Sequence, residues 1–103
     1  VLIGECSIHA IDWRNRVGEV AVCIWRPAHR GHGRGHDCLR QLMSWATGYL
    51  GLHRLEARVL DGNEPSMRLV LSLGFVYEGV LRRRYLDGGR WRDIHMLAYV
   101  TDA

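Results

Sequence analysis

A glycine-rich segment with the sequence RGHGRG, Arg30–Gly35, constrains the fold more than any other feature of the chain. Its three glycines let the backbone adopt angles that other residues avoid and approach a ligand closely. The segment opens onto a predicted helix, whose first N–H groups and dipole favour an anion. Because Arg30 and Arg34 add positive charge, the segment predicts a loop between strand and helix that binds a phosphate or pyrophosphate.

The rest of the chain alternates between strand and helix patterns. Strands are predicted over Val1–Ala10, Val17–Trp25 and Arg54–Leu60, and Phe75–Tyr85 and Trp91–Val100 form a hairpin around a turn at residues 87–89. One helix follows the glycine loop and a shorter one follows its N-cap, Asn63. The apolar face of the first helix is formed by Leu39, Leu42, Met43, Ala46, Tyr49 and Leu50. We therefore predict an α/β fold, a mixed and mainly antiparallel sheet flanked by two helices, as one domain over residues 1–103.

Composition fits this small globular domain. The 103 residues are 48% hydrophobic and 24% charged, with a net charge of +3. That charge suits an anionic ligand but is too small for a dedicated nucleic-acid binder. The longest apolar run, Val20–Trp25, is too short to span a bilayer, so we expect no membrane association.

The cysteines and histidines predict neither disulfides nor a metal site. The odd number of cysteines at positions 6, 23 and 38 matches no disulfide framework, so we expect reduced thiols and a cytoplasmic protein. Three histidines cluster near Cys38, but their spacing matches no zinc pattern and runs through the glycine loop. We expect solvated loop side chains at His29, His32 and His36.

The sequence of the glycine loop can be compared with the known motifs for different phosphate ligands. It lacks the Gly-Lys-Ser/Thr of a P-loop and the third glycine of the dinucleotide motif. It matches Gln/Arg-x-x-Gly-x-Gly/Ala through Arg30, Gly33 and Gly35, and so resembles the coenzyme A pyrophosphate loop of the GNAT N-acetyltransferases. A glycine-rich turn that only starts a helix would give the same short motif.

The resemblance extends over nearly the whole chain. Gly18-Glu19 and the residues up to Pro27 resemble the family's strand before the loop, and Asn63-x-x-Ser66 followed by Leu73-Gly74-Phe75 resembles its next helix. The segments 78–79 and 89–93 are similar to the closing strands of the RimJ/RimL branch, the ribosomal-protein N-terminal acetyltransferases. The family fold usually begins with a further strand and one or two helices, and this chain resembles it only from the second strand onward.

The resemblance implies a site for acetyl-CoA and no metal. The loop amides would hold the pyrophosphate, backbone groups of Ile24 and Trp25 would pair with the pantetheine arm, and Asn63 and Ser66 would face the thioester end. Asn63 is equally well explained as a helix cap. The implied contact residues are Ile24, Trp25, Arg30, Gly31, His32, Gly33, Arg34, Gly35, Asn63 and Ser66.

The resemblance also suggests how the reaction is catalysed. Glu19 and Glu56 are the candidate bases, although each is also expected to form an ion pair with a neighbouring arginine such as Arg58. Many family members carry a tyrosine that protonates the leaving thiolate, and the matching position here is Val70. Ser66, Tyr77 or a water could replace it, or the thiolate could leave unprotonated.

We expect an N-acetyltransferase that acts on a primary amine, at a protein N-terminus, and that forms a homodimer covering the exposed edge of the first strand. One alternative is a module that binds coenzyme A but is catalytically inactive. The other is a basic domain that binds RNA or protein through the hairpin arginines, which the simpler interpretation treats as a solvated surface. Those arginines are Arg82, Arg83, Arg84, Arg90 and Arg92.

Overall fold

The computed structural model describes residues 4–24 and 34–101. The elements occur in the predicted order and are β1 (Gly4–Asp12), β2 (Val17–Ile24), α1 (Arg34–Gly48), β3 (Arg54–Leu60), α2 (Glu64–Ser72), β4 (Val76–Asp87) and β5 (Arg90–Val100). The bounds predicted for β3 are confirmed, and the other strands differ from prediction by a few residues at their ends.

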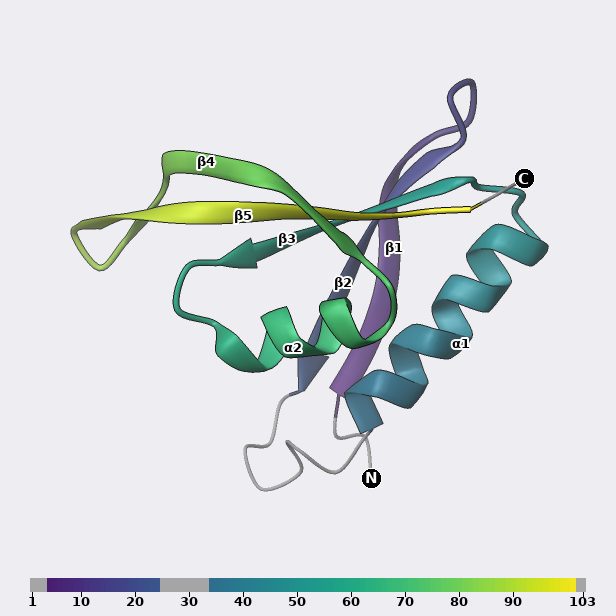
Figure 1. The fold of residues 1–103 in the computed structure, drawn as a ribbon, viewed down its shortest axis with the longest axis horizontal. Helices are drawn as coiled ribbons and strands as arrows, with labels where there is room; N and C mark the ends of the chain where they lie inside the picture. The colour runs from purple at the N-terminus through teal and green to yellow at the C-terminus, as the bar shows by residue number, and fades with distance from the viewer. Residues whose placement is uncertain (1–3, 25–33, 102–103) are drawn as a thin grey trace.

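The strands form one twisted sheet in the order β1-β2-β3-β5-β4 (Figure 1). Among the described strands, only β2 and β3 run parallel, and the other three neighbouring pairs are antiparallel. The parallel pair arises because α1 carries the chain back across the sheet between β2 and β3, as parallel neighbours require. The predicted mixed, mainly antiparallel sheet with two helices is confirmed.

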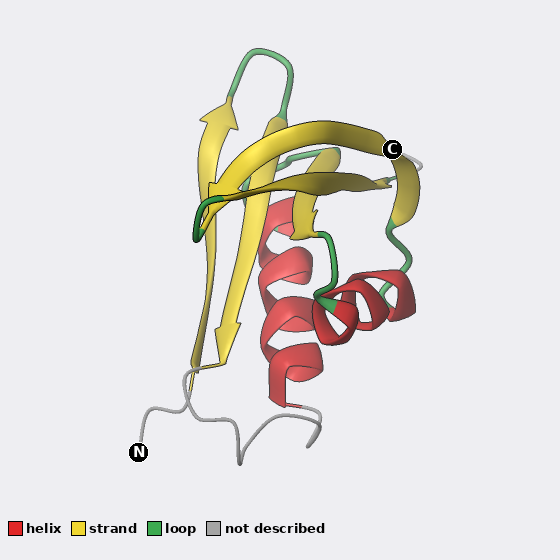
Figure 2. Ribbon diagram, turned by 90° about the vertical axis from the view of Figure 1, so that its left-hand side faces the viewer, coloured by secondary structure: helices red, strands yellow, loops and turns green. Residues whose placement is uncertain are grey.

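Both helices pack on the same face of this sheet (Figure 2). Strand β3 shows why, since its side chains alternate between buried and more exposed positions. Leu55, Ala57 and Val59 point into a core that they share with Leu39 of α1 and Val70 of α2. The intervening charged side chains of β3 lie on the opposite side of the sheet, which we call the helix-free face.

Helix α1 is held by one stripe of apolar side chains. Leu39 and Ala46 are fully buried and Met43 nearly so, as the helical spacing predicted. The prediction is wrong for Tyr49, which is 80% exposed because the helix ends at Gly48, one residue before it. Its ring stacks on Trp45 at the surface instead.

Glycines lie at two positions of the sheet where space or backbone angles are restricted, one in β2 and one at the β4–β5 turn. A Cβ added at Gly18 would lie 2.8 Å from the Cδ1 of Ile8 and 3.0 Å from the Cδ1 of Leu52, so a larger residue at this point of β2 would require the ends of these side chains to shift. At the β4–β5 turn, Gly88 and Gly89 both have positive φ angles, of 58° and 80°. The hairpin turn predicted at residues 87–89 is therefore confirmed, and the two residues between the strands are Gly88 and Gly89.

Cys38 departs from the sequence-based expectation. It lies in α1 and is disulfide-bonded, so the prediction of three reduced thiols is wrong for this residue. The count and spacing of the cysteines could not show which thiols the fold brings together. Within the described ranges, neither helix is long and apolar enough to cross a membrane.

Candidate functional site

The site begins where the two parallel strands part. Strands β2 and β3 pair over only three residue pairs, from Val17–Arg54 to Glu19–Glu56. Beyond Glu19, β2 continues to Ile24 with β1 on one side only, and β3 turns away (Figure 1). The backbone groups on the other side of β2 are therefore available to an extended ligand, which can bind there as an added strand does.

The glycine loop joins this part of β2 to α1. Trp25, Arg30, Gly31, His32 and Gly33 lie outside the described residues, so their predicted contacts with the pyrophosphate stay predictions. Ile24 is the last residue of β2, and Arg34 and Gly35 are the first two of α1. The N-terminus of α1 lies beside the end of β2 in both views (Figures 1 and 2). An anion at that helix end would thus lie next to the free side of β2.

The N-terminus of α2 is formed by a capping asparagine. The Asn63 side chain accepts a hydrogen bond from the Ser66 backbone N–H at 3.3 Å, and a proline occupies the first turn. The predicted cap is therefore confirmed, while contact of Asn63 with a ligand is untested. Asn63 is exposed and Ser66 is half-buried, so both can be reached from outside.

The two candidate bases lie side by side. Glu19 and Glu56 are direct partners in the last pair of the β2–β3 ladder, on the helix-free face. Glu19 Oε1 lies 3.5 Å from Nε of Arg58 and 3.7 Å from Nε2 of His9. Glu56 Oε2 accepts a hydrogen bond of 3.0 Å from Nε of Arg54. The predicted ion pair of Glu19 with Arg58 is thus confirmed, and both carboxylates lie at the point where the strands separate.

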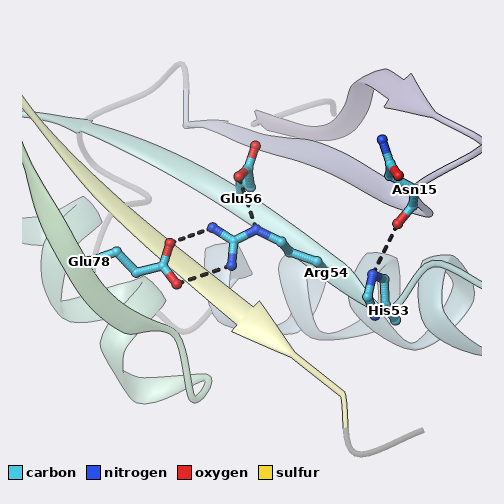
Figure 3. Close-up of polar contacts among 5 residues, drawn as sticks. All are labelled: Asn15, His53, Arg54, Glu56 and Glu78. Carbon is cyan, nitrogen blue, oxygen red and sulfur yellow. Dashed lines mark hydrogen bonds and ion pairs between the residues drawn. The ribbon is translucent and has the colours of Figure 1, made fainter.

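Arg54 links Glu56 to a third carboxylate across the sheet. Its two terminal nitrogens bind both oxygens of Glu78 on β4, and one of these bonds measures 3.0 Å (Figure 3). This bidentate hydrogen bonding raises the pKa of Arg54 and lowers the pKa of Glu78. The contact could not be predicted from the sequence, because β5 lies between the two strands and the residues are 24 positions apart.

A second polar chain lies on the helix-covered face. The Tyr77 hydroxyl lies 2.8 Å from Nδ1 of His95, whose Nε2 lies 2.9 Å from Oδ1 of Asp61 in the turn before α2. Tyr77 is paired with buried Leu97 across the β4–β5 ladder, so it faces away from Glu19 and Glu56. If Tyr77 is the proton donor, its hydroxyl is one that is already hydrogen-bonded to His95.

Val70 occupies the position where a tyrosine was expected from the resemblance. It is 5% exposed and belongs to the core between α2 and the sheet. It has no group that can donate a proton, so any acid must come from another residue or from water.

Two further features bear on the nature of the site. In residues 4–24 and 34–101, no three potential metal ligands come together. A pocket of about 640 Å³ lies at the start of β2, the opposite end from the glycine loop, and is lined by Arg14, Asn15, Arg16, Val17, Thr47, Gly51, His53 and Thr101. A contact of 3.0 Å between Nε2 of His53 and the Asn15 carbonyl oxygen joins two parts of its lining.

Comparison with known proteins places this geometry in a family. Residues 1–76 match the family model described as an acetyltransferase (GNAT) domain. An uncharacterized N-acetyltransferase, p20 of Bacillus licheniformis, is 34% identical over 94% of this chain and 54% of its own length. The chain thus spans about half the length of the curated relatives it matches.

Solved structures of acetyltransferases are similar in fold to this chain. The ribosomal-protein-S5-alanine acetyltransferase from Vibrio fischeri has a TM-score of 0.90 at 26% identity, over 97% of this chain and 55% of its own. A variant of the spermidine N-acetyltransferase SpeG from Vibrio cholerae has a TM-score of 0.89 at 26% identity, over 96% and 58%. The two neighbours have different acceptors by name, so their similarity does not distinguish between classes of amine.

Proposed function

Because the chain belongs to the GNAT acetyltransferase family, we propose that it transfers an acetyl group from acetyl-CoA to a primary amine, at a protein N-terminus. The observation that carries this proposal is the separation of β2 from β3 directly after the Glu19–Glu56 pair. It leaves the side of β2 free next to two carboxylates and beside the N-terminus of α1.

The residues present fit acetyl-CoA. The free backbone of β2, ending at Ile24, can pair with the amides of the pantetheine arm. The N-terminus of α1, at Arg34 and Gly35, offers backbone N–H groups to the pyrophosphate, and Arg34 belongs to the contact set that the resemblance implies. Asn63 at the N-terminus of α2 supplies a polar side chain for the thioester end. Trp25, Arg30, Gly31, His32 and Gly33 complete the proposed set.

Acetyl-CoA supplies an activated carbonyl, and the chain has to deprotonate the amine that attacks it. We assign this step to Glu19, because both of its ion pairs are with one oxygen, Oε1, at 3.5 and 3.7 Å, which is longer than a direct hydrogen bond. Glu56 is bound directly by Arg54 at 3.0 Å and is better suited to orienting the ammonium group. A backbone N–H of β2 stabilises the developing oxyanion.

Departure of the thiolate needs no tyrosine in this proposal. We propose that the Ser66 hydroxyl, in the first turn of α2, donates a proton to the leaving sulfur. A positioned acid contributes on the order of 10²–10⁴ in rate, so a weak donor here would slow turnover without abolishing it.

The ion pairs of the helix-free face support an N-terminal amine over a polyamine. A polyamine needs spare carboxylates for its additional cations, whereas Glu19, Glu56 and Glu78 each have an arginine or histidine partner. An N-terminal amine as the acceptor would place the chain in the RimJ/RimL branch.

A transfer assay tests the proposal. The chain is incubated with acetyl-CoA and either a peptide with a free N-terminal alanine or spermidine, and release of coenzyme A is followed with a thiol reagent. We expect faster release with the peptide, and a matched peptide with a blocked N-terminus serves as the control. Faster turnover of spermidine would overturn the acceptor assignment. Binding of acetyl-CoA without turnover of either amine would identify the inactive module that the buried Val70 favours.

A further inference from the structure

The excess positive charge of the whole chain is concentrated in one hairpin. Residues 80–94, which we call the distal hairpin, contain five arginines and two aspartates, a net charge of +3. The whole chain has the same net charge of +3, so the remainder is balanced. This segment comprises the outer parts of β4 and β5 and projects beyond the two helices (Figure 1).

The two aspartates of the distal hairpin are engaged within it. Asp87 Oδ2 lies 3.6 Å from Nη1 of Arg92, and Asp93 Oδ1 accepts the backbone N–H of Arg83 at 2.7 Å. In the described part of the chain, Arg92 is the one arginine of the hairpin that forms an ion pair, and the side chains of Arg82, Arg83, Arg84 and Arg90 form none. Their charge is therefore available to a partner.

Large apolar side chains lie exposed among these arginines. Tyr85, Leu86 and Trp91 are 48%, 56% and 53% exposed, and Val80 and Leu81 are also open to solvent. The Arg83 guanidinium lies 5.9 Å from the centre of the Trp91 ring. Leu86 and Trp91 are direct partners in the β4–β5 ladder. Tryptophan, tyrosine and arginine are the side chains that contribute most to protein interfaces, so their exposure here indicates an interaction site.

The shape of β4 suits an extended partner. It is the last strand in the sheet order, so β5 pairs with one of its sides and no described strand pairs with the other. Its ladder with β5 is interrupted between Leu81 and Tyr85, where Arg83 has a positive φ of 52°. A polypeptide segment lying along β4 would meet arginines and apolar side chains together.

We infer that the distal hairpin docks an acidic polypeptide segment that carries aromatic or aliphatic side chains. The unpaired arginines select acidic residues, because guanidinium groups bind carboxylates in bidentate fashion. The exposed valine and leucines select a protein over RNA, since only the aromatic rings would gain from stacking on bases. A second copy of the chain is disfavoured, because two hairpins of the same charge repel each other.

The inference is tested by fluorescence anisotropy with the whole chain and a labelled random copolymer of glutamate and tyrosine. Saturating coenzyme A is present throughout, so that an acidic probe does not bind at the glycine loop. Poly-glutamate of the same length and poly(U) RNA are the comparators. We expect the copolymer to bind more tightly than either of them, with an affinity that falls as salt is added.

Two variants of the distal hairpin should each weaken binding of the copolymer about tenfold. They are the double variant Arg82→Gln/Arg84→Gln and the single variant Trp91→Ala. The control, Arg14→Gln/Arg68→Gln, removes the same charge from exposed positions outside the hairpin and should bind as the unchanged chain does. Tighter binding of poly(U), equal binding of poly-glutamate, or an equal loss in the control would each overturn the inference. The double arginine variant leaves the apolar contacts of the hairpin intact, so its result stands even if Trp91→Ala is unstable.

Discussion

Asn63 is the residue at which a structural and a ligand-binding role can be separated most cleanly. Its side chain caps α2 through the 3.3 Å bond from the Ser66 N–H, and it is also assigned to the thioester end of acetyl-CoA. Replacing Asn63 with alanine removes both functions. Replacing it with serine keeps an oxygen that can cap the helix but removes the amide group.

The expected magnitudes follow from the geometry. A lost N-cap costs about 0.5–2 kcal/mol, and the length of this bond and its exposure put the loss at about 0.5–1 kcal/mol. For a domain of this size that lowers the melting temperature by roughly 2–8 °C. Loss of one hydrogen bond to the ligand should weaken acetyl-CoA binding by about tenfold in both variants.

Thermal unfolding followed by circular dichroism measures the cap, and titration calorimetry with acetyl-CoA measures the contact. Asn63→Ala should lose both stability and affinity, whereas Asn63→Ser should lose affinity alone. If the serine variant binds acetyl-CoA as tightly as the unchanged chain does, Asn63 is only a cap. If the alanine variant melts at the unchanged temperature, the capping argument is wrong.

Four further predictions follow from the structure. Glu19→Gln should lower the rate constant of acetyl transfer on the order of 10²–10⁴-fold, measured by coenzyme A release at saturating substrate, and Glu56→Gln should lower it less. Leu55→Ala should cost about 2–5 kcal/mol in urea unfolding, because the side chain is fully buried, and a loss below about 1 kcal/mol would contradict the core described here. The pKa of Glu78 is lowered by its bond to Arg54, so its contribution to stability is complete above the unfolded pKa of about 4.3 and is lost as the pH falls through the folded value. Glu78→Gln should therefore flatten the fall in melting temperature between about pH 5 and pH 3, and an unchanged slope would exclude the link to Arg54. Strand β1 lies at the edge of the described sheet, and we propose that a second copy pairs with it; light scattering should give twice the chain mass, and the monomer mass would refute the pairing.

The order of the elements could be predicted because each element carries its own local signal. The bounds of β3 follow from the strict alternation of Leu55, Ala57 and Val59 with charged residues. The cap at Asn63 and the two-glycine hairpin turn follow from short motifs whose geometry only a few residues allow. The prediction that Tyr49 lies on the apolar face of the first helix is wrong, because the helix ends at Gly48 and the Tyr49 ring is exposed.

Contacts between distant segments could not be predicted from the sequence. The sheet order brings Arg54 across β5 to Glu78, and the β2–β3 register places Glu19 beside Glu56. Both depend on which strands become neighbours, which periodicity does not encode. The disulfide at Cys38 was missed for the same reason.

The central claim is that this chain binds acetyl-CoA beside the free side of β2 and at the N-terminus of α1. Titration calorimetry of the chain with acetyl-CoA tests it most directly, with coenzyme A and ADP as comparators. We predict saturable binding at one site that requires the whole coenzyme and is lost when Gly33 and Gly35 are both replaced by bulky residues. An absence of binding at millimolar acetyl-CoA, or unchanged binding by that double variant, would contradict the claim.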